Sequence, residues 1–300
     1  MSARGRHVLV LVAAVATLAA ADRADAALPA DTTAVISGTS DLLGTFPTPV
    51  GSANVGRQSV SADGGRVAFT STSDGLLAGD DDTVSNVYVR ESATGTLTLV
   101  SRATGVDGEP SHADCTSAAI SADGTRVAFS CEGALDPADT NKDPDVYVRD
   151  LQTGQTVLVS RAAGLGPVGN RDSLKPSIDR NGTHVAFESR ATNLSEGEVV
   201  PDGSYRIYWR SIGAGDPTLL NSRATGPVGA VPPGSAENAS ISLDGGRVAF
   251  DTPDAMDPAD TNGTFDAYVR DIRAAPTTIL VSRVDGGGGA VGNGSSERPL

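Results

Sequence analysis

The strongest constraint on the fold of this chain is a phrase that occurs four times. Its copies read SVSADGGRVAF, AISADGTRVAF, SIDRNGTHVAF and SISLDGGRVAF, and they end at Phe69, Phe129, Phe187 and Phe250. A second phrase follows each copy, centred on Tyr88, Tyr147, Tyr208 and Tyr268, and a third ends at Arg102, Arg161, Arg223 and Arg283. Three phrases kept in the same order, about 60 residues apart, indicate a repeat architecture.

Each repeat reads as four short strands, which in the second copy are expected at 119–121, 127–129, 146–149 and 157–160. Asp123-Gly124 and Thr153-Gly154 supply the tight turns, because glycine tolerates the positive φ that such turns need. No stretch shows a sustained helical period of apolar residues. The sequence therefore predicts an all-β fold.

The faces of these small sheets indicate how the repeats assemble. Val146 and Val148 point to one face and Tyr147 to the other, so both faces are apolar and both should be covered. A neighbouring repeat on each side provides that cover. We predict a β-propeller of four-stranded antiparallel blades, near 57–103, 117–162, 176–224 and 239–284, with a stacked solenoid as the alternative.

The phrases ISADGTRVAFS and DVYVRDLQTGQTVLVSRA resemble the repeat of TolB-like, WD40-like β-propellers. In that family Ser-x-Asp-Gly opens the blade, and a strand containing Tyr precedes a Thr-Gly turn. The resemblance covers roughly residues 57–300 and departs in the third copy, where Asn181 replaces the turn Asp and Arg206 replaces an Asp before the third strand. Such propellers serve many functions, so the resemblance constrains function weakly.

Residues 1–26 are expected to be a secretory signal peptide. Arg4 and Arg6 precede an apolar run at 8–21, and Ala24-Asp25-Ala26 fits a cleavage site. The apolar run is too short to span a bilayer as a helix, so the mature chain should be extracellular or periplasmic, without a membrane span.

The two ends of the repeat region suggest partial blades. Residues 27–56 form a lead-in in which Thr33–Ser37 resembles an outer closing strand, and Glu297–Leu300 falls where a further blade would begin. We expect either a chain truncated relative to a complete ring or a small ring with an irregular closing blade.

The formal net charge of −14, with Lys142 and Lys175 as the only lysines, excludes nucleic acid as a partner, because phosphate binding needs clustered basic residues. An extracellular protein, peptide or glycan is expected as the partner of what is predicted to be a monomer. The long connections, which should share one face of the disc, are the expected binding surface.

Three of these connections place oxygen-bearing side chains at alternate positions, a spacing that suits Ca²⁺. The candidate ligands are Asp139, Asn141, Asp143 and Asp145; Asp260, Asn262, Thr264 and Asp266; and, more weakly, Asp80, Asp82 and Asn86. The alternative is that these side chains cap turns by accepting hydrogen bonds from backbone N–H groups.

Cys115 and Cys131 lie at equal distances from the turn residue Asp123, so they should face each other across a strand pair and form a disulfide. Two buried thiols are the alternative. The repeated arginines, among them Arg149, Arg210 and Arg270, are expected to pair with Asp residues between blades.

No catalytic constellation is evident. His112 and His184 read as surface residues, and no nucleophile elbow occurs. We therefore predict a non-catalytic binding propeller. The alternatives are a carbohydrate-active propeller enzyme that gathers carboxylates with His112 or Arg171 at its centre, and the propeller portion of a longer hydrolase.

Overall fold

The computed structural model describes residues 52–77, 82–195, 200, 203–213, 217–273, 275–284 and 288–299. The expected signal peptide, the strand at Thr33–Ser37, the candidate ligand Asp80 and the terminal Leu300 lie outside the described residues. Within them the chain forms β-strands only, and no helix there is long and apolar enough to cross a membrane.

The strands form four antiparallel sheets of four strands each, and within each sheet the strands follow sequence order. Blade one contains β1 (Ala53–Asn54), β2 (Arg66–Ser71), β3 (Asn86–Glu91) and β4 (Leu97–Leu99). Blade two contains β5 (Cys115–Ile120), β6 (Arg126–Cys131), β7 (Asp145–Asp150) and β8 (Thr156–Leu158). Blade three contains β9 (Ser173–Ile178), β10 (His184–Ser189), β11 (Arg206–Ser211) and β12 (Thr218–Leu220). Blade four contains β13 (Glu237–Ile241), β14 (Arg247–Thr252), β15 (Asp266–Asp271) and β16 (Thr277–Leu280).

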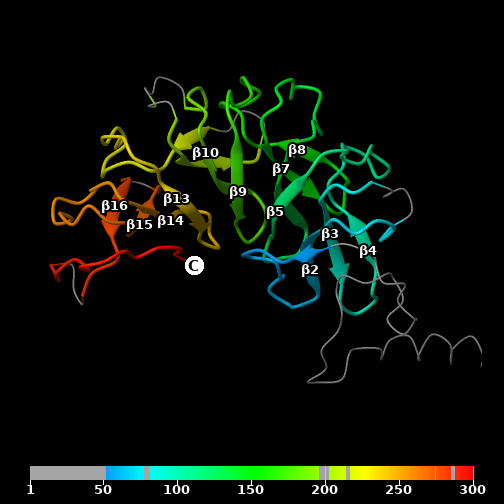
Figure 1. Cartoon of the computed structure of the whole chain (residues 1–300), viewed down its shortest axis with the longest axis horizontal. Helices are drawn as coiled ribbons and strands as arrows, with labels where there is room; N and C mark the ends of the chain where they lie inside the picture. Colours follow the sequence, from blue (N-terminus) through cyan, green and yellow to red (C-terminus); the bar gives the residue numbers. More distant parts are fainter. Residues whose placement is uncertain are drawn as a thin grey trace, which may run out of the picture.

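The blades follow one another around an arc in sequence order (Figure 1). The first strands of blades two to four contact one another in turn, β5 with β9 and β9 with β13, whereas blade one contacts β5 through β2 and β3. Because each sheet is an antiparallel meander, the Asp-Gly and Thr-Gly turns lie on one side of the disc. The long connections, such as 132–144, lie on the other side, here called the long-loop face. The predicted all-β propeller architecture is confirmed.

The core lies between the blades. Val146 and Val148 of β7 are buried against Phe187 and Tyr208 of blade three, whereas Tyr147 packs toward blade one. We call the side of a blade that faces its successor the trailing face. Both faces of the sheet are therefore covered, as the apolar pattern predicts.

Blade four differs on its trailing face. Val281 is 51% exposed, whereas Val159, at the same position in blade two, is 0% exposed. The C-terminal segment covers only the axial end of this face. There Ser296 N donates to Phe265 O at 2.7 Å, as Ala236 N donates to Tyr205 O at 2.9 Å one blade earlier.

The Asp-Gly turns are held by side-chain hydrogen bonds. In blade two the Ser121 hydroxyl donates to Asp123 Oδ1 at 2.6 Å, and Asp123 Oδ1 accepts the N–H of Thr125. Gly124 adopts a φ of 73°, which a side chain would disfavour.

Blade three builds the same turn differently. Asp179, at the position of Ser121, accepts the backbone N–H groups of Thr183 and His184, while Asn181 takes the position of Asp123. His184 Nδ1 lies 2.7 Å from Asp179 Oδ2, and its ring stacks on Trp209. His184 remains a partly exposed residue, with 28% of its side chain exposed, and Trp209 and Asp179 fix its orientation.

Cys115 and Cys131 are direct partners in the register of β5 and β6, and they form a disulfide. The predicted pairing is confirmed. It follows from their symmetric placement about the Asp-Gly turn, because an antiparallel hairpin pairs residues at equal distances from its turn.

Repeated arginines connect neighbouring blades, and the bonds between blades that are described for Arg149 and Arg270 run to carbonyl oxygens and not to the predicted Asp residues. Arg283 does lie near a carboxylate, with Nη1 3.7 Å from Asp257 Oδ2 of its own blade. Arg149 Nη1 donates to Ala103 O at 3.0 Å, and Arg149 Nη2 donates to Gly105 O at 2.8 Å. Arg210 and Arg270 make the equivalent bonds to the loops that follow blades two and three. A guanidinium offers five N–H donors, so converging carbonyl oxygens can satisfy it without a carboxylate.

Candidate functional site

The innermost strands of the blades carry residues in an unusual backbone conformation. Ser117, Lys175 and Asn238 occupy equivalent positions and have φ values of 56°, 48° and 58°, and Arg298 in the C-terminal segment has 59°. In blade one the next residue, Gln58, has a φ of 51°. These five are the positive-φ residues other than glycine in the described chain. Residues with a side chain adopt this conformation at a cost in free energy, and such strain concentrates at functional positions.

The ladder bulges where these residues lie. Its register shifts between Thr116 and Ala119 of β5 and between Glu237 and Ser240 of β13. A β-bulge turns a side chain out of the regular alternation of the strand. Here it directs one side chain from each blade toward the axis.

The residue at the bulge differs from blade to blade. It is Ser117 in blade two, Lys175 in blade three and Asn238 in blade four, and Arg57 takes the equivalent sequence position in blade one, beside the positive-φ residue Gln58. The neighbouring positions vary as well, so variation alone does not single out this one. Its placement at the axis makes it a candidate for ligand contact.

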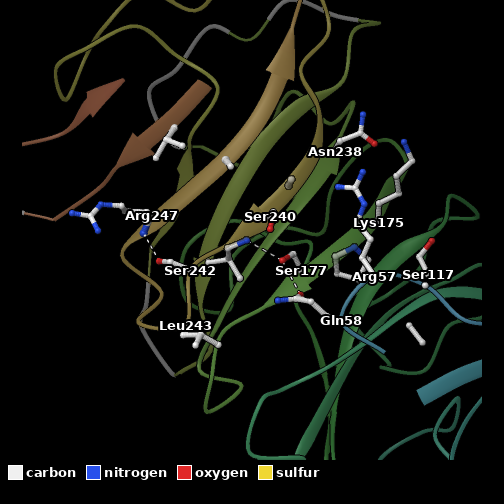
Figure 2. A pocket seen from close by; sticks show the side chains of 17 residues that line it. Arg57, Gln58, Ser117, Lys175, Ser177, Asn238, Ser240, Ser242, Leu243 and Arg247 are labelled. Atoms are coloured by element: carbon white, nitrogen blue, oxygen red, sulfur yellow. Dashed lines mark hydrogen bonds between the residues drawn. The ribbon is translucent and has the colours of Figure 1, made fainter. Parts of the chain in front are cut away.

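These side chains surround a cavity of about 750 Å³ on the axis, here called the axial cavity. Figure 2 shows Arg57, Lys175 and Asn238 at one end of it and Leu243 at the other. Lys175 and Asn238 lie near the starts of β9 and β13, which places this end toward the long-loop face, and Arg57 follows β1.

Hydrogen bonds between blades fix the wall of the cavity. Gln58 Oε1 accepts the Ser177 hydroxyl at 2.9 Å and the Ile178 N–H at 3.0 Å, which joins blade one to blade three. Ser177 Oγ in turn accepts the N–H of Ile241 in blade four at 2.9 Å. The wall is therefore preorganised, as a binding site requires.

Buried carboxylates behind the bulges hold them in place. Glu188 Oε1 accepts the N–H of Asn238 at 2.5 Å, and Asp251 Oδ2 accepts the N–H of Arg298 at 2.7 Å. Lys175 Nζ lies 3.1 Å from Glu188 Oε2. Burial raises the pKa of Glu188, and the nearby Lys175 ammonium opposes that rise.

The predicted calcium ligands in blade two make hydrogen bonds within the protein. Asp139 Oδ2 accepts the Tyr147 hydroxyl, and Asp145 Oδ1 accepts the Ser160 hydroxyl at 2.5 Å. Asn141 Nδ2 donates to Asp145 Oδ2 at 3.0 Å, and Asn141 Oδ1 accepts the N–H of Asp143 at 2.7 Å. Burial raises the pKa of Asp145 to about 7.

Blade four repeats this network. Asp260 accepts the Tyr268 hydroxyl, Asn262 donates to Asp266 Oδ2 at 2.9 Å, and Thr264 N donates to Asn262 Oδ1 at 2.8 Å. Asp266 Oδ1 accepts the Ser282 hydroxyl.

In blade one, Asn86 Oδ1 accepts the Ser101 hydroxyl, and Asp82 Oδ1 accepts the N–H of Val84. Across the described ranges, no group of three or more His, Cys, Asp or Glu side chains is arranged to hold a metal ion.

The histidine and arginine considered for catalysis do not line the axial cavity. His112 lies on the surface between Glu109, with Nε2–Oε1 at 3.1 Å, and Asp82, with Nδ1–Oδ2 at 3.4 Å. Arg171 is also exposed. His112 and Arg171 are thus not gathered at the centre. The enzyme alternative also required unrepeated polar residues from different blades at the axis, and Arg57, Lys175 and Asn238 are such residues.

Sequence reasoning missed the axial residues. The aligned repeats hold Arg, Ser, Lys and Asn at this position, but the residues on either side vary too, so the sequence carries no signal that separates it from its neighbours.

No known protein-family model matches the chain, and no curated protein matches it in sequence. Among solved structures, TolB from Acinetobacter baumannii is similar at 16% identity and a TM-score of 0.44, over 78% of this chain and 45% of that one. A putative TolB from Agrobacterium tumefaciens is similar at 14% identity and a TM-score of 0.42, over 78% of this chain and 63% of that one. An oligogalacturonate lyase in complex with manganese is similar at 12% identity and a TM-score of 0.41, over 74% of this chain and 51% of that one.

The chain thus spans less than two thirds of each of these proteins. Its own sheets define a β-propeller of four-stranded antiparallel blades. The prediction of a β-propeller is confirmed by these sheets at the level of the fold.

Proposed function

We propose that this protein is a secreted, non-catalytic binding propeller that holds an extracellular protein, peptide or glycan at its long-loop face and axial cavity. The observation that carries the proposal is the set of strained bulge residues, which differ between blades and surround one preorganised cavity. Strain of this kind costs about 1–3 kcal/mol per residue.

Export of the chain is part of this proposal. The positive start, apolar run and small-residue site in residues 1–26 support it, as does the disulfide between Cys115 and Cys131, since disulfides persist in oxidising compartments.

The two parts of the binding surface differ in charge. Exposed acidic residues on the long connections include Asp107, Glu109, Asp114 and Glu132, whereas Arg57 and Lys175 lie at the axis. A ligand that places a basic or neutral surface on the loops and an acceptor group on the axis would complement both parts.

The test is a screen of peptide and glycan arrays with the protein and its Lys175→Ala variant. We expect the ligands bound by the protein to be lost by Lys175→Ala and kept by Lys142→Ala. Lys142 is a matched control, because it is the other lysine, is exposed and does not line the cavity. Equal binding by both variants, or turnover of a bound glycan, would contradict the proposal.

Calcium binding at the predicted loops remains a second proposal, and one atom favours it. Asp139 Oδ1 in blade two is buried and has no hydrogen-bond partner, which is unusual for a carboxylate oxygen. We expect Ca²⁺ to raise the melting temperature relative to EGTA, and Asp139→Asn to remove that difference. Identical melting curves in Ca²⁺ and EGTA would contradict it.

A further inference from the structure

We propose that the loop-side end of the axial cavity binds the C-terminal residue of a peptide, with the terminal carboxylate between Arg57 and Lys175. This inference rests on the proposed binding function and names the chemistry of its ligand.

The first support is the meeting of two cations. Arg57 comes from blade one and Lys175 from blade three, and Figure 2 shows both at the same end of the cavity. Lys175 lies near two carboxylates, with its Nζ 3.1 Å from Glu188 Oε2 and 4.0 Å from Glu237 Oε2. The hydrogen bond described for Arg57 runs to a neutral carbonyl oxygen. The chain has 23 basic against 37 acidic residues, so this meeting is not a consequence of a general excess of cations.

The second support is how these cations are bonded. Other arginines near the turns pair across strands with carboxylates, as Arg66 pairs with Glu91 at 2.8 Å. The hydrogen bond described for Arg57 instead runs from Nη1 to the neutral Pro299 O at 3.2 Å. Lys175 contacts Glu188, but its side chain is 49% exposed and an ammonium has three donors.

The acids at this end of the cavity already have donors from the protein. Glu188 is buried and accepts the Asn238 N–H and the Lys175 ammonium, and Asp251 is buried and accepts the Asn238 amide and the Arg298 N–H. The charged side chains that line this end of the cavity are therefore those of Arg57 and Lys175, beside the hydroxyl of Ser117 and the amide of Asn238. A planar carboxylate supplies the matching acceptors, and charge-assisted bonds to it are strong.

The third support is the wall next to these donors. It is formed by small aliphatic residues, among them Ala118, Pro176, Ala239 and Ile241, and no aromatic residue lines the cavity. An aliphatic side chain gains free energy when buried against such a wall. Polar side chains, among them Ser117, Asn238 and Ser240, line the cavity as well. The aliphatic part of the wall is what favours a peptide with an aliphatic side chain over an acidic glycan.

A C-terminal residue satisfies both parts of the site at once, because its carboxylate and its side chain leave the same carbon atom. The carboxylate would lie between Arg57 and Lys175, and an aliphatic side chain would enter the cavity. Its volume of about 750 Å³ lies within the range of ligand pockets.

The test uses the full chain and a fluorescent peptide ending in Ser-Ala-Leu, measured by anisotropy as the free acid and as the C-terminal amide. We expect the amide, and the acid with Arg57→Ala, to bind about tenfold more weakly or worse, since one lost charge-assisted contact exceeds 1.4 kcal/mol. Lys142→Ala should bind the acid normally. An acidic peptide amidated at its C-terminus shows whether a side-chain carboxylate suffices.

Each result decides the question. The carboxylate inference is overturned if the free acid and the amide bind equally, or if neither binds. It is also overturned if the amidated acidic peptide binds as tightly as the free acid. The proposed binding function is tested separately by Asn238→Ala in the array screen. If this variant loses the ligands that the protein binds, the binding function stands even when the carboxylate inference fails. Circular dichroism of every variant shows that the fold is retained.

Discussion

In blade three the carboxylate of the repeated turn lies two residues earlier than in the other blades. Ser-x-Asp has become Asp179-x-Asn181, and Asp179 still caps the backbone N–H groups beyond the glycine. The departure visible in the sequence is therefore a compensated exchange and not a loss. Comparing the repeats shows the exchange at Asn181, but only the structure shows that Asp179 takes over its bonds.

This exchange predicts a reversible effect on stability. Asp179→Ser should lower the free energy of unfolding by roughly 1–3 kcal/mol, because buried N–H groups lose their acceptor. Adding Asn181→Asp recreates the turn of the other blades and should recover most of the lost free energy of unfolding. Urea unfolding of the single and double variants measures both, and a double variant no better than the single would contradict the prediction.

The turn aspartates also predict a dependence on pH. The Ser61 hydroxyl and the Gly65 N–H lower the pKa of Asp63, and Ser242 and Gly246 do the same for Asp244. Their ionised forms therefore stabilise the fold at pH values above about 4, the ordinary Asp pKa. That contribution is lost as pH falls through the lower pKa of the folded state.

We expect the melting temperature to fall on acidification from pH 5 to pH 3. The Asp63→Asn, Asp244→Asn variant should lose less over that range, because Asn does not titrate and already occupies this turn position in blade three. An equal fall in both proteins would show that other groups cause the acid sensitivity.

At the scale of the strand, the sequence predicted more of the sheets than of the bulges. Period-two patterns and Asp-Gly turns are local signals, so the sixteen described strands lie close to the phrases that indicated them. A left-handed residue such as Lys175 has no local signal, because four inner strands meeting at the axis impose its conformation. The arginine contacts were missed for a similar reason, since their acceptors are backbone atoms of another blade.

The exposed trailing face of blade four predicts unequal effects of equal substitutions. Val159→Ala should cost roughly 2 kcal/mol, because its side chain is fully buried against blade three. Val281→Ala, at the same position in blade four, should cost less than about 1 kcal/mol. Chemical denaturation of the two variants makes the comparison, and similar losses would mean that Val281 is covered in solution.

For the whole molecule, contacts between neighbours carry the stability, so the blades should open at different free energies. Blades two and three each have a described blade on either side, whereas blade four has one only on its leading side. We expect amide hydrogens in β14 and β15 to exchange before those in β6, β7 and β10. Uniform exchange across all the strands would indicate a single cooperative unit.

The chain provides its own optical reporter for that behaviour. Its one tryptophan, Trp209, belongs to blade three, yet its indole N–H donates to Gly245 O of blade four at 2.9 Å. Separation of the last blade would bring water to this indole while the remaining sheets stay intact. A red shift in fluorescence emission that precedes the loss of far-ultraviolet dichroism would then record the opening of a single junction, without any label.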